Sequence, residues 1–222
     1  AMDRLPQVAV IRNSGADIIA LQEVSDDAVE VLHDHLRDRY PYRVLYPKGV
    51  AGTGLLSRYP LLEAEVTELT PGTYNTRAVV DVGGVPITVI SAHPPAPITS
   101  FNRRYTRRGR REIQRLLGLV RDAPGPVLLM GDFNHADQSR DYRLMPAAGL
   151  QDAFREAGWG LGPTWPCRIR YLGRSLPLVR IDYIWTTPHF HIRRCWVGPP
   201  GNSDHAPVIA DVVVIPGSLR TG

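Results

Sequence analysis

Short runs of apolar residues that stop at a turn signal recur along the chain, and each predicts a β-strand. The clearest is Val127–Met130, an apolar run that is followed at once by Gly131. A short apolar run between turn signals is typical of a fully buried strand. Similar runs predict strands over Asp17–Gln22, Tyr42–Tyr46, Ala51–Ser57, Leu61–Leu69, Thr76–Val82, Val85–Ser91, Val179–Trp185 and Val208–Val214.

Apolar residues at helical spacing predict helices between some of these strands. Leu5–Asn13 has this spacing, and Gly15 is suited to end the helix. Ser25 opens a second helix, and the C-terminal half of Ser100–Val120 has the apolar stripe of a surface helix. The stripe of the second helix consists of Ala28, Val31, Leu32, His35 and Leu36. Strands mixed with helices indicate an α/β chain, and 222 residues suit a single domain over residues 1–222.

Polar residues with chemical potential stand directly after the clearest strand. Asp132 and Asn134 are two positions apart, so their side chains leave the same face if the strand geometry persists. A carboxylate beside a carboxamide is a poor core and a good site for a hard cation or a water nucleophile. A plain turn is the competing interpretation, because Gly, Asp and Asn are all turn formers.

Two further strand ends carry residues of the same kind. Gln22-Glu23 closes the first apolar run, and Ser203-Asp204-His205 precedes the last. The motifs LQE, GDFN and SDH, in this order, resemble the endonuclease/exonuclease/phosphatase superfamily, which includes DNase I-like nucleases, sphingomyelinases and inositol-polyphosphate phosphatases. The resemblance runs from about Leu5 to Val214. It implies a four-layer α/β/β/α sandwich of two mixed, mostly antiparallel sheets with the helices outside.

The resemblance also implies a role for each motif residue. Glu23, with Asp204, would bind Mg²⁺ or Mn²⁺, and Asp132 and Asn134 would position and activate a water. His205 would act as general base or as a stabiliser of the transition state. Asp182 would orient His205, and His93 would contact the scissile phosphate. The sequence GPTW at 162–165 would form a family-like turn in a rigid loop close to the site.

Simple structural roles are open for the same residues. Glu23 could serve as a carboxylate at the amino end of the following helix, and His93 as a histidine at the end of a buried strand. Asp182 lies among apolar strand residues, where a carboxylate is costly to bury without a partner. The resemblance implies that the motif histidine is this partner, which predicts that Asp182 lies close to His205 or His93.

One departure from the family is expected to matter. The family usually opens with a strand that ends in an Asn, ahead of the helix that precedes LQE, and this Asn helps to hold the metal. Here the sequence starts at that helix, and Asn13 is on its wrong side. Three explanations are open: the strand was left out of this sequence, it lies upstream in a longer parent protein, or this chain is a divergent member of the family without it. Its loss is expected to expose one sheet edge and to weaken metal affinity.

Charge and cysteine content add only a little. The net charge is +4, and Lys48 is the only lysine, so the basic excess is arginine. This balance favours an anionic substrate, and Arg58 and Arg77 are candidate substrate contacts. The arginines of 103–111 form either a solvated helix face or a track for nucleic acid or anionic lipid. Two cysteines, Cys167 and Cys195, do not make a disulfide framework, and whether they pair is open.

The expected function is that of a Mg²⁺-dependent phosphoesterase. It would hydrolyse a phosphodiester or a phosphomonoester by in-line attack of an activated water. Nuclease, lipid phosphodiesterase and phosphatase share such a site and differ in their loops, so the motifs do not choose between them. The alternative, favoured by the missing Asn, is a degenerate domain that binds without catalysis. No apolar stretch of the chain is long enough to span a membrane.

Overall fold

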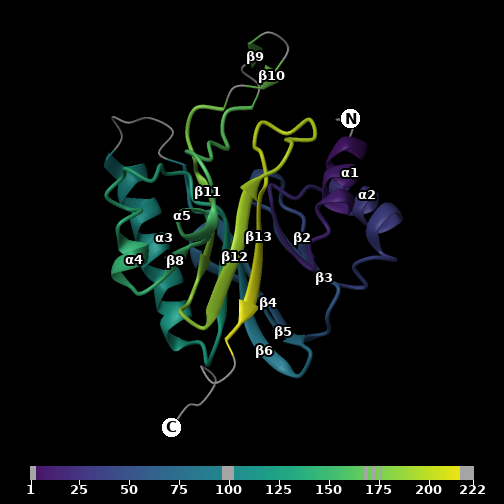
Figure 1. Cartoon of the computed structure of the whole chain (residues 1–222), viewed down its shortest axis with the longest axis horizontal. Coiled ribbons are helices and arrows are strands. Elements are labelled where there is room, and N and C mark those ends of the chain that lie inside the picture. Colours follow the sequence, from purple (N-terminus) through teal and green to yellow (C-terminus); the bar gives the residue numbers. More distant parts are fainter. Residues whose placement is uncertain (1–3, 97–102, 168–169, 172–173, 176, 216–222) are drawn as a thin grey trace.

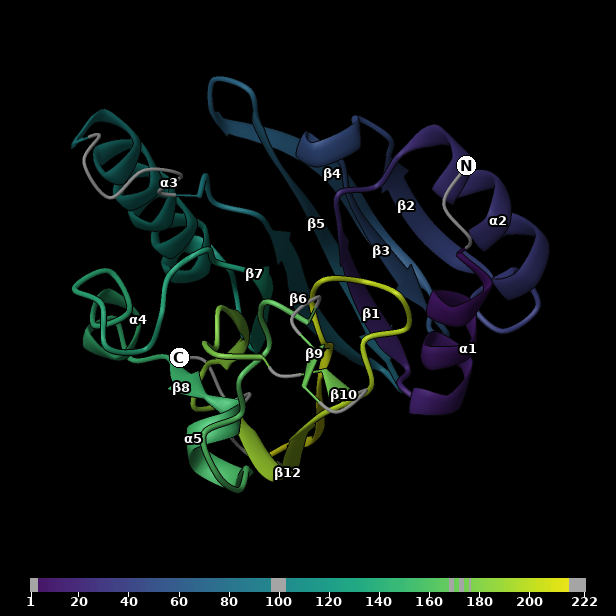
Figure 2. The same ribbon diagram turned by 90° about the horizontal axis from the view of Figure 1, so that it is seen from above.

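A computed structural model describes residues 4–96, 103–167, 170–171, 174–175 and 177–215 of the chain. Its elements form the four layers that the resemblance implies, with two layers of strands between two layers of helices (Figures 1 and 2). The helices are α1 (Leu5–Ser14), α2 (Asp26–Leu36), α3 (Arg103–Asp122), α4 (Leu144–Ala147) and α5 (Ala153–Ala157), with a 3₁₀ turn, η1, at Gly49–Ala51. Figure 2 shows α1 and α2 on one side of the strands and α3 and α4 on the other.

The first strand layer is a continuous sheet of six strands in the order β4-β5-β6-β7-β11-β8. All of its pairs are antiparallel except β6 with β7, which are parallel. Its strands are β4 (Leu61–Thr70), β5 (Thr73–Val82), β6 (Val85–Ala92), β7 (Val127–Asp132), β8 (Gln151–Asp152) and β11 (Asp182–Thr186).

The second strand layer is divided into two pieces. A three-stranded sheet has the order β1-β3-β2, with β1 (Ile18–Gln22), β2 (Tyr42–Tyr46) and β3 (Thr53–Ser57). A separate ribbon pairs β12 (Phe190–Val197) with β13 (Val208–Val214). Within the described residues no strand joins β1 to β13. A small hairpin, β9 (Arg170–Tyr171) with β10 (Arg174–Ser175), projects at the top of Figure 1.

Apolar side chains hold the layers together. Leu55 of β3, Val89 of β6 and Met130 of β7 belong to one buried cluster between the two strand layers. On the opposite face of the six-stranded sheet, Ile113 and Leu116 of α3 pack into a second cluster. The apolar stripe predicted for this helix therefore faces the core.

Several predicted elements are confirmed, and others differ. The first helix ends at Gly15, whose φ of 70° is a left-handed conformation that suits glycine. His35, expected on the apolar stripe of α2, is exposed. The expectation of a buried strand over Asp17–Gln22 was wrong, because every residue of β1 is only half-buried, whereas all of β3 beside it is buried. The physical reason is that β1 pairs on one edge only among the described residues.

The polar interior holds one unusual acid. Glu112 of α3 has no exposed surface, and its carboxylate accepts hydrogen bonds from the Asn75 carboxamide (2.6 Å) and the Thr70 hydroxyl. Burial raises the pKa of Glu112 to about 7 from an ordinary 4.5, against the opposing hydrogen bond from Asn75 and the charges of Arg115 and Arg108. The carboxyl therefore holds its proton to a higher pH in the folded chain than in the unfolded chain.

This acid predicts a pH-dependent stability. Between pH 4.5 and about 7 the folded state binds more protons than the unfolded state, so the free energy of unfolding falls as the pH rises. The loss is about 3 kcal/mol at most, since each pKa unit corresponds to about 1.4 kcal/mol. Glu112→Gln should remove this decline and leave the variant more stable than the parent at pH 8. Denaturant unfolding at pH 5 and pH 8 measures both effects, with the exposed Glu30→Gln as control. Equal pH profiles for Glu112→Gln and the parent would contradict the assignment.

Candidate active site

Strand register brings the predicted residues to one end of the six-stranded sheet. Ala92 of β6 lies beside Gly131 of β7, so the next residues, His93 and Asp132, are also neighbours. On the other side of β7, Asp182 of β11 is the direct partner of Asp132. Residues far apart in sequence therefore meet because their strands end at one edge.

Gly131 permits the close approach of these strand ends. Its φ of 144° is rarely adopted by residues with a side chain, and a Cβ atom there would lie 2.0 Å from the carbonyl oxygen of Ala92. The same position faces the Gln22 carboxamide at the end of β1, which donates to the Ser91 hydroxyl at 3.0 Å. A glycine is therefore required where β1, β6 and β7 come together.

The predicted contact between Asp182 and His205 is confirmed. The His205 Nδ1 atom lies 2.9 Å from Asp182 Oδ2 and 3.2 Å from Oδ1. The other ring nitrogen, Nε2, is 3.9 Å from Asp132 Oδ2, and His93 Nε2 is 3.5 Å from the same oxygen. Asp132 therefore lies between two histidines, one of which is held by a second carboxylate.

Asp132 and Asn134 also form the turn that was the competing interpretation. The Asp132 Oδ1 atom accepts the backbone N–H of Asn134 at 2.8 Å, and Asn134 has a left-handed φ of 56°. The Asn134 carboxamide donates to the carbonyl of Pro94 at 3.1 Å. The turn leaves Asp132 Oδ2 facing the histidines, so the presence of a turn does not conflict with a chemical role for Asp132.

The electrostatics of the site favour charged histidines. Burial opposes protonation of His205, but its hydrogen bond to Asp182 and the charges of Asp182, Asp132 and Asp204 outweigh this and raise its pKa to about 9. Burial likewise opposes protonation of His93, and contact with Asp132 and the charge of Glu23 outweigh it and raise its pKa. Burial also raises the pKa of Asp182, against the hydrogen bond from His205. The proton between Asp182 and His205 belongs to His205, since the imidazolium is held by several nearby anions.

Glu23 and Asp204 lie at the edge of this arrangement. Ligand atoms of Asp132, Asp182 and His205 come within 4.8 Å of one another, and among the described residues neither Glu23 nor Asp204 joins that group. Both line the same cavity as the group, and both act on its histidines through their charge. Glu23 is exposed and has a left-handed φ of 56°, which turns the chain away from β1.

The predicted arginine contacts are not brought to the site. Arg58 pairs with Asp17 at 2.8 Å, at the start of β1, roughly 20 Å along the strand from Glu23. Arg77 pairs across the sheet with Glu65 at 3.2 Å. Both guanidinium groups are engaged by nearby carboxylates, which the sequence pattern does not reveal.

The arginine run lies on α3. Within it, Arg108 donates to the carbonyl of Pro71 and lies 3.5 Å from the Thr73 hydroxyl, so it supports a turn. Arg110 pairs with Asp141 at 2.8 Å, whereas Arg107 and Arg111 are exposed. The side chains at 103–106 lie outside the described residues. The described part of the run therefore divides between structural contacts and a solvated face.

Sequence reasoning missed two supports of the site. The Thr164 hydroxyl, fully buried, accepts the backbone N–H groups of Ile181 (3.1 Å) and Asp182 (3.3 Å) and so fixes the start of β11. Arg180 forms two hydrogen bonds to Asp152, at 2.8 and 2.9 Å. An arginine and an aspartate in otherwise apolar strands signal such a buried pair, although the partner cannot be named from sequence.

The expected rigid loop does lie close to the site. Trp165 pairs with Val179 through reciprocal backbone hydrogen bonds of 2.9 Å, and its ring centroid is 6.4 Å from that of His205.

Cys167 and Cys195 are both free and buried, which answers the open question about their pairing.

Comparison with known proteins identifies the family to which this chain is similar. The model of the Endonuclease/Exonuclease/phosphatase family matches residues 7–205. An uncharacterized protein of Escherichia coli K12, YbhP, is 28% identical over 240 aligned positions, which cover 94% of this chain and 88% of YbhP.

Solved structures show the same fold. An endonuclease/exonuclease/phosphatase from Beutenbergia cavernae has a TM-score of 0.81 at 23% identity, covering 96% of this chain and 67% of that one. TDP2 of D. rerio, complexed with a single-strand DNA product, has a TM-score of 0.77 at 16% identity, covering 96% and 94%. The match of the family model over most of the chain shows that this protein belongs to the endonuclease/exonuclease/phosphatase family of phosphoester hydrolases.

Proposed function

We propose that this chain hydrolyses a phosphate ester by in-line attack of water, assisted by a divalent cation. The observation that supports this most is the contact series Asp182–His205–Asp132–His93, in which one carboxylate oxygen faces two imidazole nitrogens. Such a series can remove a proton from water on one side and neutralise a phosphoryl oxygen on the other.

The residues would divide the work as follows. Asp132 Oδ2 accepts a hydrogen bond from the attacking water, and Asn134 holds Asp132 in place through its backbone N–H. His205 presents Nε2 to the reacting oxygen, because its Nδ1 is occupied by Asp182. His93 donates from Nε2 to a nonbridging phosphoryl oxygen. Asp182 touches no substrate and acts as a positioning residue for His205.

The chemistry of the donor set fits a hard divalent cation. Glu23 and Asp204 offer carboxylate oxygens on the wall of the cavity that Asp132, Asp182 and His205 also line. Oxygen donors of this kind suit Mg²⁺ or Mn²⁺, so Glu23 with Asp204 would hold the ion. When bound, the cation neutralises negative charge on the phosphoryl oxygens.

A substrate panel tests the proposed function. With Mg²⁺ or Mn²⁺ we expect turnover of at least one substrate among plasmid DNA, abasic DNA, sphingomyelin, inositol polyphosphates and a sugar phosphate. When a chelator is added, the rate should fall to that measured without enzyme. The panel also shows whether the substrate is a nucleic acid or a lipid. No described helix is long and apolar enough to cross a membrane. Full activity in chelator would refute the role of the cation. Cation binding without turnover of any substrate would favour the alternative function, a degenerate domain that binds without catalysis.

A further inference from the structure

Two large apolar side chains project into solvent from the loop that follows α5. Trp159 is 95% exposed and Leu161 is 88% exposed, more than any other large apolar side chain among the described residues. They alternate with glycines in the sequence GWGLG at 158–162. Single exposed apolar residues are common on protein surfaces. Two that stand so close together, and are so completely exposed, indicate a surface that meets a partner. We call Trp159 and Leu161 the apolar tip.

The glycines on either side hold this loop against the ring of Phe154. A Cβ atom on Gly158 would lie 2.5 Å from the carbonyl oxygen of Phe154, and one on Gly162 would overlap the Phe154 ring. The Gly158 N–H also donates to that carbonyl at 2.9 Å. Phe154 itself is buried, with the Arg180 guanidinium 5.1 Å from the centre of its ring. Both ends of the loop are therefore fixed, and this frame keeps the apolar tip displayed.

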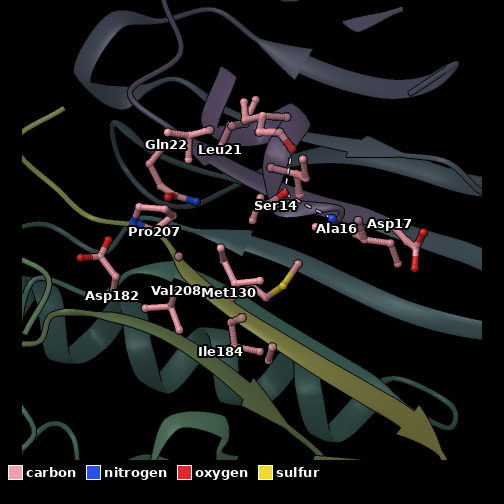
Figure 3. Close-up of a pocket in the computed structure, with 18 of the residues that line it drawn as sticks. Ser14, Ala16, Asp17, Leu21, Gln22, Met130, Asp182, Ile184, Pro207 and Val208 are labelled. Atoms are coloured by element: carbon pink, nitrogen blue, oxygen red, sulfur yellow. Dashed lines mark hydrogen bonds between the residues drawn. The ribbon is translucent and has the colours of Figure 1, made fainter. Parts of the chain in front are cut away.

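The apolar tip is separate from the cavity beside the proposed active site. That cavity, of about 990 Å³, lies between β1 and β13, and Figure 3 shows Gln22 and Asp182 near one end of it. Neither Trp159 nor Leu161 lines it. The apolar tip is therefore a protrusion into solvent, and a molecule held in the cavity would not cover it.

The size of the apolar tip favours a lipid surface over a protein as its partner. A stable protein interface buries about 800 Å² on each side, whereas a tryptophan and a leucine supply roughly a few hundred. Insertion into lipid needs no matching surface, because lipid chains close around the side chain that enters. Tryptophan is also enriched where membrane meets water, since its ring is apolar and its N–H is polar. The net charge of +4 adds attraction to anionic lipids.

We propose that the apolar tip docks this chain on a lipid surface, with Trp159 and Leu161 inserted between the headgroups and the upper parts of the lipid chains. Four positions after Leu161, the ring centroid of Trp165 lies 6.4 Å from that of His205. Four residues span at most about 14 Å, so docking would bring the proposed active site close to the lipid. Docking rests on the two exposed side chains and does not require the proposed phosphoesterase activity.

Binding to lipid vesicles tests this proposal. Vesicles of phosphatidylcholine mixed equally with phosphatidylglycerol are sedimented with the chain, and the bound fraction gives the partition coefficient. We expect the parent to bind, and Trp159→Ser and Leu161→Ser each to weaken binding about tenfold, because each change removes a large apolar side chain from the lipid. The matched control is Leu62→Ser, which should bind as the parent does, since Leu62 is 59% exposed on β4, away from the loop.

Fluorescence tests whether Trp159 itself enters the lipid. Vesicles should shift the parental tryptophan emission to shorter wavelength. Trp159→Phe should still bind, because it keeps a large apolar ring, but should lose most of that shift. Circular dichroism and thermal unfolding confirm that each variant is folded, which is expected because both side chains are exposed.

Three results would overturn the proposal. The first is a parent that does not bind the mixed vesicles. The second is equal binding by Leu161→Ser and Leu62→Ser. The third is a dimer that forms without lipid and is lost in Trp159→Ser, which would make a second copy of the chain the partner of the apolar tip. None of these measurements uses turnover, so failure of the docking is distinct from failure of the proposed activity.

Discussion

Asp182→Asn should lower the turnover number by roughly a hundredfold or more, the usual scale for a lost acid–base contribution. The variant keeps the shape of the side chain but removes the charge that faces His205 Nδ1 at 2.9 Å. The imidazole would then lose its fixed orientation and tautomer, and its pKa would fall from about 9 towards an ordinary value, because the anion that favours the charged form is gone.

Three measurements separate this positioning role from a general loss of structure. The turnover number should fall while KM changes little, cation binding by calorimetry should persist, and NMR titration of the cation-free protein should show the lower His205 pKa. Asp211→Asn is the matched control, since Asp211 lies on β13 and, in the part of the chain that the structure describes, forms an ion pair only with Arg194, at 3.9 Å. A variant with parental turnover and an unshifted His205 titration would remove Asp182 from the mechanism.

Glu23→Gln should act in the opposite order and weaken the cation first. The change keeps the length of the side chain but replaces a charged oxygen ligand with a neutral carboxamide. We expect the affinity for Mg²⁺ to fall by about tenfold or more, which is about 1.4 kcal/mol, while much of the turnover returns at saturating Mg²⁺. Calorimetric titration and the Mg²⁺ dependence of the rate measure the two effects.

Glu30→Gln is the control for this experiment, because Glu30 is exposed on α2 and lines no part of the cavity. If Glu23→Gln bound Mg²⁺ as tightly as the parent, Glu23 would be reduced to its simpler role as a carboxylate at the amino end of α2. Comparison of Asp182→Asn with Glu23→Gln therefore tests orientation and cation binding as separate functions of one site.

Much of this fold could be predicted because local sequence pattern and packing agree. The run Val127–Met130 is buried as expected, since its strand has neighbours on both edges. Asp17–Gln22 has a similar pattern but is only half-buried, because burial depends on what lies beside a strand as well as on its own residues. The ribbon strand Phe190–Val197 was not predicted, since its alternation of buried and exposed residues is broken between Ile192 and Arg194, where the register against β13 shifts.

The site could be predicted only in part, for a related reason. The pairing of Asp182 with His205 could be inferred because a carboxylate in an apolar strand needs a partner, and the resemblance to the family named the histidine. The true environments of Arg58 and Arg77 could not, since surface ion pairs depend on which strands become neighbours. Thr164 was missed because its contribution is two hydrogen bonds to backbone, which leave no mark in the sequence.

The meeting of strand ends at Gly131 has a consequence for how the chain folds. Gln22 and Ser91, which bond there, are separated by 69 positions in sequence, and His205 and Asp182 by 23. Closing loops of this length loses chain entropy before any contact is gained, so topologies of this kind fold slowly compared with helical bundles. During synthesis the site cannot assemble until the ribosome has released the segment around His205. A nascent chain that stops earlier would hold Asp132 and Asp182 without the imidazole that Asp182 positions.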